Sequence, residues 1–146
     1  MLDDARWVPF VSDCFRFRHP PDATLQVLNG PPLPEGAARI FLGGPTIRDP
    51  HGGKTPAYNM TMFTYQPSAD ASLEHNVANG VFLPAGSDVV FQAGQHQGQA
   101  VTWMMLGSTR TGMIARIRGR AVIVRWHAQS ADSPLDQILE SLTFTE

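Results

Sequence analysis

Four short apolar runs, closely spaced and separated by glycine, constrain this chain more than any other feature of its sequence. They span residues 89–93, 99–106, 112–117 and 121–128, and the points where the chain must reverse lie at or beside Gly94, Gly98, Gly107 and Gly119. Glycine adopts the positive φ that tight hairpins require, so the pattern predicts an antiparallel meander of four strands. A sheet of this kind needs other elements to cover it.

Earlier apolar runs extend the predicted sheet. They cover residues 14–18, 24–28, 39–42 and 57–65. In the first run, Phe15 and Phe17 alternate with Arg16 and Arg18, which is typical of a strand with one buried side and one side in solvent. The segments 29–36 and 43–56 are predicted to be long loops, and a loop of the second length is uncommon unless it has a role.

Two helices are expected, one at the C-terminus and one near the middle of the chain. Ser133 is placed to cap the C-terminal helix and Pro134 suits its first position. Apolar residues then recur at the spacing of one helical face, at Leu135, Ile138, Leu139 and Leu142. A weaker pattern predicts a helix over about residues 68 to 79, closed by an Asn-Gly pair. The order of elements predicts an α+β fold.

Size and composition favour one ordinary domain over residues 1–146. The chain has 146 residues, 11 basic and 13 acidic side chains, and a net charge of -2, which does not favour general nucleic-acid binding. Its single cysteine, Cys14, excludes an intramolecular disulfide and therefore a disulfide scaffold. No run approaches the roughly 18 apolar residues of a membrane span, and the first residues do not read as a signal peptide. We therefore expect a cytoplasmic protein.

Both ends of the chain are similar to those of a known family. Trp7 is followed by Phe15-Arg16-Phe17-Arg18-His19-Pro20, and the chain ends in Ile138-Leu139-Glu140-Ser141-Leu142-Thr143-Phe144. Together with the late meander, these segments resemble the PsbP-like proteins, which include bacterial proteins of the DcrB type. The resemblance implies an α/β/α sandwich, in which helices cover a largely antiparallel sheet. It also implies a non-enzymatic accessory role, and it brings no catalytic residues to this sequence.

The sequence contains no catalytic or metal-binding motif with the required spacing. The segment Gly52-Gly53-Lys54-Thr55 ends like a phosphate-binding loop, but Arg48 stands where that motif needs its first glycine. The five histidines have no metal-ligand spacing, and no serine lies in a Gly-x-Ser-x-Gly turn. Cys14 has no base near it in the sequence, so a small, partly buried thiol is expected. We predict no catalytic residue, no metal site and no cofactor.

Basic side chains supply two candidate contact sites for an anion or a partner protein. One lies in the glycine-rich loop and the other on the last hairpin, at Arg48, His51 and Lys54, and at Arg116, Arg118, Arg120 and Arg125. Arginine donates bidentate hydrogen bonds to carboxylate or phosphate, although solvated turns and protected sheet edges also carry such charges. The interpretation of both groups therefore stays open at this point.

Aromatic and methionine side chains suggest what the sheet contacts. Alternation places Trp103 and Met105 on one face and Met104 on the other, so part of this set must lie under helices or form an exposed apolar patch. We expect a non-enzymatic binding or accessory protein that engages a protein partner, or a second copy of itself, through a sheet face or edge. The alternatives are a small-molecule-binding protein or enzyme that uses Arg116, Arg125 or His127 in a sheet–helix cleft, and a chaperone for apolar segments.

Overall fold

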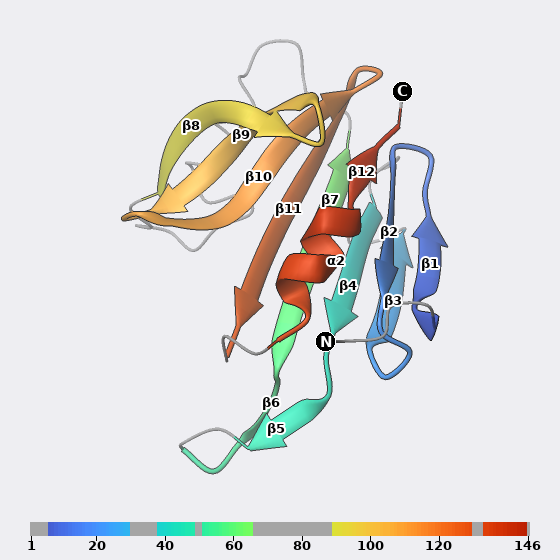
Figure 1. Cartoon of the computed structure of the whole chain (residues 1–146), viewed down its shortest axis with the longest axis vertical. Helices are drawn as coiled ribbons and strands as arrows, with labels where there is room; N and C mark the ends of the chain where they lie inside the picture. The colour runs from blue at the N-terminus through green and yellow to red at the C-terminus, as the bar shows by residue number, and fades with distance from the viewer. Residues whose placement is uncertain (1–5, 30–37, 49–50, 66–88, 130–132, 146) are drawn as a thin grey trace.

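The computed structural model describes residues 6–29, 38–48, 51–65, 89–129 and 133–145 (Figure 1). Within these ranges the chain forms strands almost throughout and one short α-helix. The elements are β1 (Val8–Val11), β2 (Phe15–His19), β3 (Thr24–Asn29), β4 (Ala38–Gly43), β5 (Thr46–Arg48), β6 (Lys54–Pro56), β7 (Tyr58–Tyr65), β8 (Val89–His96), β9 (Gln99–Leu106), β10 (Thr109–Ile117), β11 (Arg120–Ala128), α2 (Leu135–Ser141) and β12 (Thr143–Phe144).

A seven-stranded sheet organises the molecule. Its order is β3-β4-β7-β11-β10-β9-β8, and all neighbouring pairs are antiparallel. In β7, burial alternates residue by residue, as expected for a strand whose two sides meet different surroundings. Met60 of β7 is in register with Leu42 of β4 and Trp126 of β11, so these three side chains share one side of the sheet. We call this side the first face and the opposite side the second face.

The predicted four-strand meander is confirmed. Strands β8, β9, β10 and β11 follow one another in the sheet, and their turns use residues with positive φ. Gln97 and Gly98 have φ values of 51° and 80°, and Arg118 and Gly119 have values of 51° and 78°. Two successive positive φ values are typical of the tight turn that matches strand twist. Gly94, expected beside a reversal, instead lies inside β8.

A second, smaller sheet contains segments from both ends of the described chain. Its order is β1-β2-β12. Phe15 and Phe17 are buried and Arg16 and Arg18 are exposed, which confirms the pattern predicted for this strand. Phe144 of β12 is in register with Phe15 and is also buried. These aromatic side chains belong to the same core as the first face of the large sheet, so the two sheets pack against each other.

The predicted C-terminal helix is confirmed as α2 and is shorter than its apolar pattern. The helix begins one residue later than predicted, because Pro134, expected at the first helical position, is the N-cap. Ser133, expected to be the cap, accepts the backbone N–H of Leu135 on its Oγ at 3.4 Å. Leu135 and Ile138 are buried on the helix, and Leu142 is buried just beyond its end. All three join the first-face core, so burial of this stripe holds α2 against the sheets.

The central strands are buried on both of their faces. On the first face the core includes Met60, Met62, Val122 and Val124. On the second face a separate cluster contains Met104, Ile114, Ala121 and Ile123. Trp103 belongs to the first-face core and Met105 packs against it, while Met104 lies in the second cluster, as the alternation predicted.

The turn between β8 and β9 contacts the end of α2. His96 Nε2 lies 2.7 Å from the backbone oxygen of Leu142, and Gln97 donates from its side-chain amide to the backbone oxygen of Glu140, also at 2.7 Å. The His96 ring meets the rings of Trp103 and Phe144 edge-on. Figure 1 shows β8 and β9 curving towards β12, which brings this turn to the helix. Side chains from the turn therefore satisfy carbonyl groups at the end of α2, which have no partner inside the helix.

The predicted α+β fold, and with it the α/β/α sandwich implied by the resemblance, is wrong. The described residues are mostly antiparallel sheet, and their one helix has seven residues. Part of the layer that was expected to be helical is instead the three-stranded sheet. Its outer strands, β1 and β12, have only four and two residues, and they are strands because both pair with β2. The helix expected at residues 68–79 lies outside the described residues. No helix in the described part of the chain has the length and apolar character needed to cross a membrane.

The segment 43–56 is also different from its prediction. It was expected to be a long loop, but β5 and β6 within it pair as a two-stranded ribbon. Arg48 lies opposite Lys54 in this ribbon. The segment contains only three-residue strands, so its alternation is too short to distinguish a ribbon from a loop.

Candidate functional site

Strand β3 forms one edge of the seven-stranded sheet and carries exposed apolar side chains. Its pairing partner is β4, and no described strand pairs with its other side. Val27 is 54% exposed and Leu28 is 46% exposed. Val27 pairs with Ile40 and lies on the first face, whereas Leu28 pairs with Arg39 and lies on the second. The strand therefore offers backbone hydrogen-bonding groups along its edge and an apolar side chain on each side.

A cavity of about 260 Å³ lies on the first-face side of β3, between the two sheets. Its apolar wall includes Phe10 and Val11 of β1, Val27 of β3 and Ile40 of β4. Arg120 lies among its polar lining residues. Val11 is itself strongly exposed, so the rim of this cavity is apolar and open to solvent. The cavity suits an apolar side chain that enters from the edge of the sheet.

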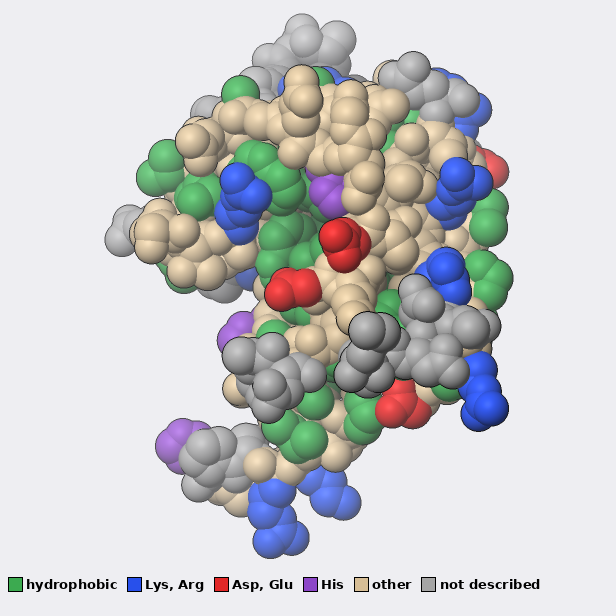
Figure 2. All heavy atoms as spheres, in the orientation of Figure 1, with side chains coloured by type: hydrophobic (Ala, Val, Ile, Leu, Met, Phe, Trp, Pro, Cys, Tyr) green, Lys and Arg blue, Asp and Glu red, His purple; other side chains and the backbone are tan. Residues whose placement is uncertain are grey.

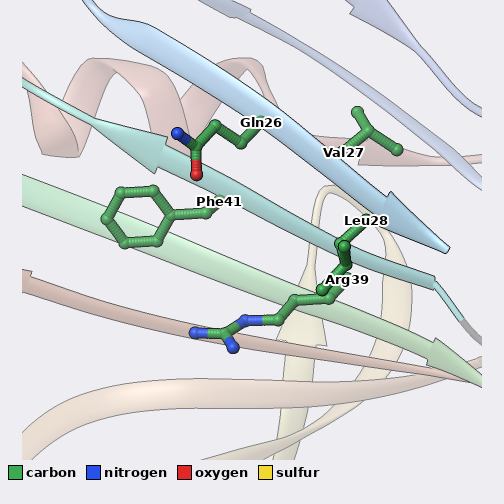
Figure 3. Close-up of a pocket in the computed structure, with 5 residues that line it drawn as sticks. All are labelled: Gln26, Val27, Leu28, Arg39 and Phe41. Atoms are coloured by element: carbon green, nitrogen blue, oxygen red, sulfur yellow. The ribbon is translucent and has the colours of Figure 1, made fainter. Parts of the chain in front are cut away.

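A larger cavity, of about 640 Å³, lies on the second-face side of the same strand. Figure 3 shows Gln26 and Leu28 of β3 beside Arg39 and Phe41 of β4, while Val27 points away from this group. The guanidinium of Arg39 lies over the ring of Phe63, 5.5 Å from its centroid. An arginine held over an aromatic ring keeps N–H groups at its edges for an acceptor, so this cavity has an apolar floor and a cationic group.

The hairpin arginines do not form one site, because strand alternation separates them. Arg116 is exposed and Arg125 is half-buried, and both lie on the second face. Arg118, in the turn, donates to the backbone oxygen of Asp13, and Arg120 points to the first-face cavity. Burial lowers the pKa of the Arg125 guanidinium from its ordinary value. Of this group, only Arg120 belongs to the site at β3.

The other basic group lies at the opposite end of the large sheet. Arg48, His51 and Lys54 are exposed on or beside the β5–β6 ribbon. This ribbon continues into the start of β7, whereas Arg120 lies beside the end of β7, since its neighbour Ala121 is in register with Tyr65. Figure 1 shows the ribbon and the β10–β11 turn at opposite ends of the molecule. The two predicted basic groups therefore do not combine.

His19 and Cys14 are both buried. His19 is buried and its Nδ1 lies 2.8 Å from the backbone oxygen of Pro20. Cys14 is almost fully buried, more than the partial burial predicted, and it lines the first-face cavity. Within the described ranges, no group of three His, Cys, Asp or Glu side chains is arranged to hold a metal ion.

The sheet–helix cleft proposed as an alternative does not contain its expected anchors. Arg125 and His127 alternate with Trp126 along β11, so they lie on the second face, away from α2. Arg116 lies on that face as well. What faces the helix side is Trp103, which is perpendicular to Trp126 and has the guanidinium of Arg110 4.3 Å above its ring.

The residues at the β3 edge were not among the candidates from sequence. Trp and Met side chains were expected to form any exposed apolar patch, but most of them are buried in the two cores. The exposed apolar side chains are smaller, as at Val27 and Leu28. Their strand, Thr24–Asn29, has apolar residues at both parities and no charge, a pattern that could have indicated an edge exposed on both sides.

The chain was compared with known proteins in three ways, and none produced a match. No family model matches it, and no match was found among curated proteins or solved structures. The resemblance to the PsbP-like proteins therefore stays a prediction from short motifs.

Proposed function

We propose that this protein is a non-enzymatic binding protein that takes up an extended segment of a partner polypeptide along strand β3. The observation that carries the proposal is an edge strand with exposed Val27 and Leu28 and a cavity against each of its faces. In this mode of recognition, backbone hydrogen bonds to the edge supply affinity, and pockets for alternate side chains supply specificity.

The residues of β3 itself lack the features that normally prevent strand addition. Natural sheet edges are protected by charged residues, proline, bulges or a covering element. Strand β3 contains none of the charged residues or prolines, and its pairing with β4 is continuous from Thr24 to Asn29. Among the described residues, no strand pairs with the outer side of this regular edge. Such an edge costs solubility, so it supports a binding role.

A small-molecule-binding protein is the second candidate, and the cavity beside Arg39 favours it. Its volume of about 640 Å³ lies within the range of ligand pockets. The site differs from the sheet–helix cleft that the sequence suggested, because it lies on the second face of β3 and β4. A chaperone for apolar segments would use the same edge with less sequence preference, and the binding experiment separates these three functions.

The test uses fluorescent peptides of about eight residues, a common strand length, in which valine and glutamine alternate. We expect fluorescence anisotropy to report binding to the natural protein and its loss in Val27→Lys, because the lysine occupies the entrance of the first-face cavity. Val90→Lys is the matched control. Val90 is 64% exposed on β8, the other edge of the same sheet, and we expect this variant to bind as the natural protein does.

Four results would contradict the proposal. The absence of binding would refute strand addition at β3, and equal loss in Val27→Lys and Val90→Lys would remove the assignment to this edge. Retention of a small molecule in native mass spectrometry, displaced by Arg39→Gln, would favour the second candidate. A dimer in sedimentation that Val27→Lys dissociates would show that a second copy occupies the edge.

A further inference from the structure

The two cavities at β3 differ in chemistry, and this difference bears on which segment the edge accepts. Successive side chains of a strand point to opposite faces, so a segment added to β3 directs alternate residues into alternate cavities. The first-face cavity has apolar walls at Phe10, Val11, Val27 and Ile40, and its two charged lining residues, Asp13 and Arg120, have opposite signs. The second-face cavity contains Arg39 together with Gln26 and Phe41. Each cavity therefore contacts every second side chain of the segment.

We infer that the bound segment alternates apolar and acidic side chains, with the acidic ones facing Arg39 on the second face. This inference rests on the function proposed above, since it names the chemistry of the partner at the same edge. A carboxylate is the natural counterpart of a guanidinium, because the two form paired, charge-assisted hydrogen bonds.

Arg39 is available for such a contact. It is exposed, and within the described residues its guanidinium has no carboxylate partner and rests on the ring of Phe63. Neither β3 nor β4 contains an acidic residue that would compete for it. Figure 3 shows the Arg39 side chain extending from β4 across the sheet, with Leu28 between it and the open edge.

The geometry of neighbouring strands favours glutamate over aspartate in the segment. Arg39 is directly opposite Leu28, and a residue of the added strand lies directly opposite Leu28 on its other side. Two cross-strand steps of about 5 Å therefore separate the Cβ atoms of Arg39 and of the added residue. Arg39 lies over Phe63 of β7, on the side of β4 away from β3, so this contact requires the Arg39 side chain to leave that ring and turn back over Leu28. A longer acidic side chain in the segment shortens the distance that Arg39 must cover.

The charges around the edge favour the same partner. Arg16 and Arg18 are exposed on the outer side of the small sheet, and Arg120 lines the first-face cavity. Figure 2 shows Lys and Arg side chains spread along the margin that β1 and β2 occupy in Figure 1. An acidic segment approaching this margin is attracted to it.

The test compares three labelled peptides of about eight residues, in which valine alternates with glutamate, glutamine or lysine. We expect the Val-Glu peptide to bind about three- to tenfold more tightly than the Val-Gln peptide, and the Val-Lys peptide to bind more weakly than both. In Arg39→Gln the preference for glutamate over glutamine should disappear, while the Val-Gln peptide binds as before. A peptide with aspartate in place of glutamate should lose part of the gain.

Arg110→Gln provides a matched control for the arginine. Arg110 is also exposed and also lies over an aromatic ring, but it is on β10, away from β3. We expect this variant to keep the preference for glutamate, because a general effect of protein charge would change equally in both variants. Higher salt should reduce the preference, since the contact is exposed.

The outcomes separate this inference from the function on which it rests. Equal binding of the Val-Glu and Val-Gln peptides, with both lost in Val27→Lys, would overturn the acidic preference and leave strand addition intact. A preference that Arg110→Gln reduces as much as Arg39→Gln would also overturn it. Failure of all three peptides to bind would refute the proposed function itself.

Discussion

The contact between the β8–β9 turn and the end of α2 allows the most direct test of how this fold is held together. His96 joins three parts of the molecule, since it lies at hydrogen-bond distance from the backbone oxygen of Leu142 and touches the rings of Trp103 and Phe144. We predict that His96→Ala lowers the free energy of unfolding and that His96→Phe does so by a smaller amount. Phenylalanine keeps a ring between the two aromatic neighbours but cannot donate to the carbonyl.

The expected magnitudes follow from these contacts. A hydrogen bond contributes about 0.5 to 1.5 kcal/mol net, and each aromatic pair adds about 0.5 to 1.5 kcal/mol beyond the burial of its surface. His96→Ala removes one hydrogen bond and two ring contacts, so we expect a loss of about 2 to 4 kcal/mol. His96→Phe removes only the hydrogen bond, so the expected loss is about 1 kcal/mol.

Urea unfolding followed by tryptophan fluorescence measures both values, because Trp103 is in contact with the substituted ring. With a slope of about 2 kcal/mol per molar urea, the middle of the usual range, His96→Ala should lower the midpoint by roughly 1 to 2 M. His127→Ala is the control, since His127 is exposed on the second face and should change stability by less than about 0.5 kcal/mol. A loss below that level in His96→Ala, or equal stability of His96→Phe and the natural protein, would refute the assigned contacts.

Two further predictions concern the first-face core. The Tyr58 side chain is buried, and its hydroxyl has no hydrogen-bond partner among the described residues; burial, with a smaller contribution from Asp22, raises its pKa from 10.0 to about 12. The tyrosine of the unfolded chain therefore ionises at lower pH than the folded one, so the free energy of unfolding should fall between about pH 10 and pH 12. In urea titrations at a series of pH values, Tyr58→Phe should flatten this fall and should cost little stability at neutral pH. An unchanged pH profile in this variant would contradict the assignment. Ile138 is fully buried on α2, so Ile138→Ala should lower the free energy of unfolding by about 2 to 5 kcal/mol, whereas Gln137→Ala, on the exposed side of the same helix, should change it by less than about 0.5 kcal/mol. Similar urea midpoints for these two helix variants would show that the helix stripe is not packed as described.

Local patterns predicted the elements whose signal is contained in their own residues. The four-strand meander followed from apolar runs and glycines, and α2 followed from leucine and isoleucine at one helical spacing. The alternation of Phe15 and Phe17 with Arg16 and Arg18 correctly assigned the two sides of β2. In each case a few neighbouring residues determine both the backbone geometry and the buried side.

Elements that depend on distant partners were missed or misread. Strand β12 is two residues long and is a strand because β2 lies beside it, and the β5–β6 ribbon is similarly short. The α/β/α sandwich was wrong for the same reason, because part of the layer assigned to helices consists of strands recruited from both ends of the chain. The stability that such a short strand gains from pairing with a distant strand leaves no pattern in its own residues.

The candidate site likewise combines features that a local pattern predicts with features that depend on distant contacts. The sequence by itself determined that Trp103 and Met104 face opposite sides, because this relation depends only on alternation along one strand. The register of the β10–β11 hairpin, which places Arg116 and Arg120 on opposite faces, came from the structure. Only the tertiary structure decided that β3 is an edge, that the small sheet leaves a cavity beside Val27, and that Arg39 stands over Phe63 beside a second cavity. Strand order and the stacking of sheets are set by contacts between residues far apart in the chain, so a short window of sequence determines the faces of a strand but not its neighbours.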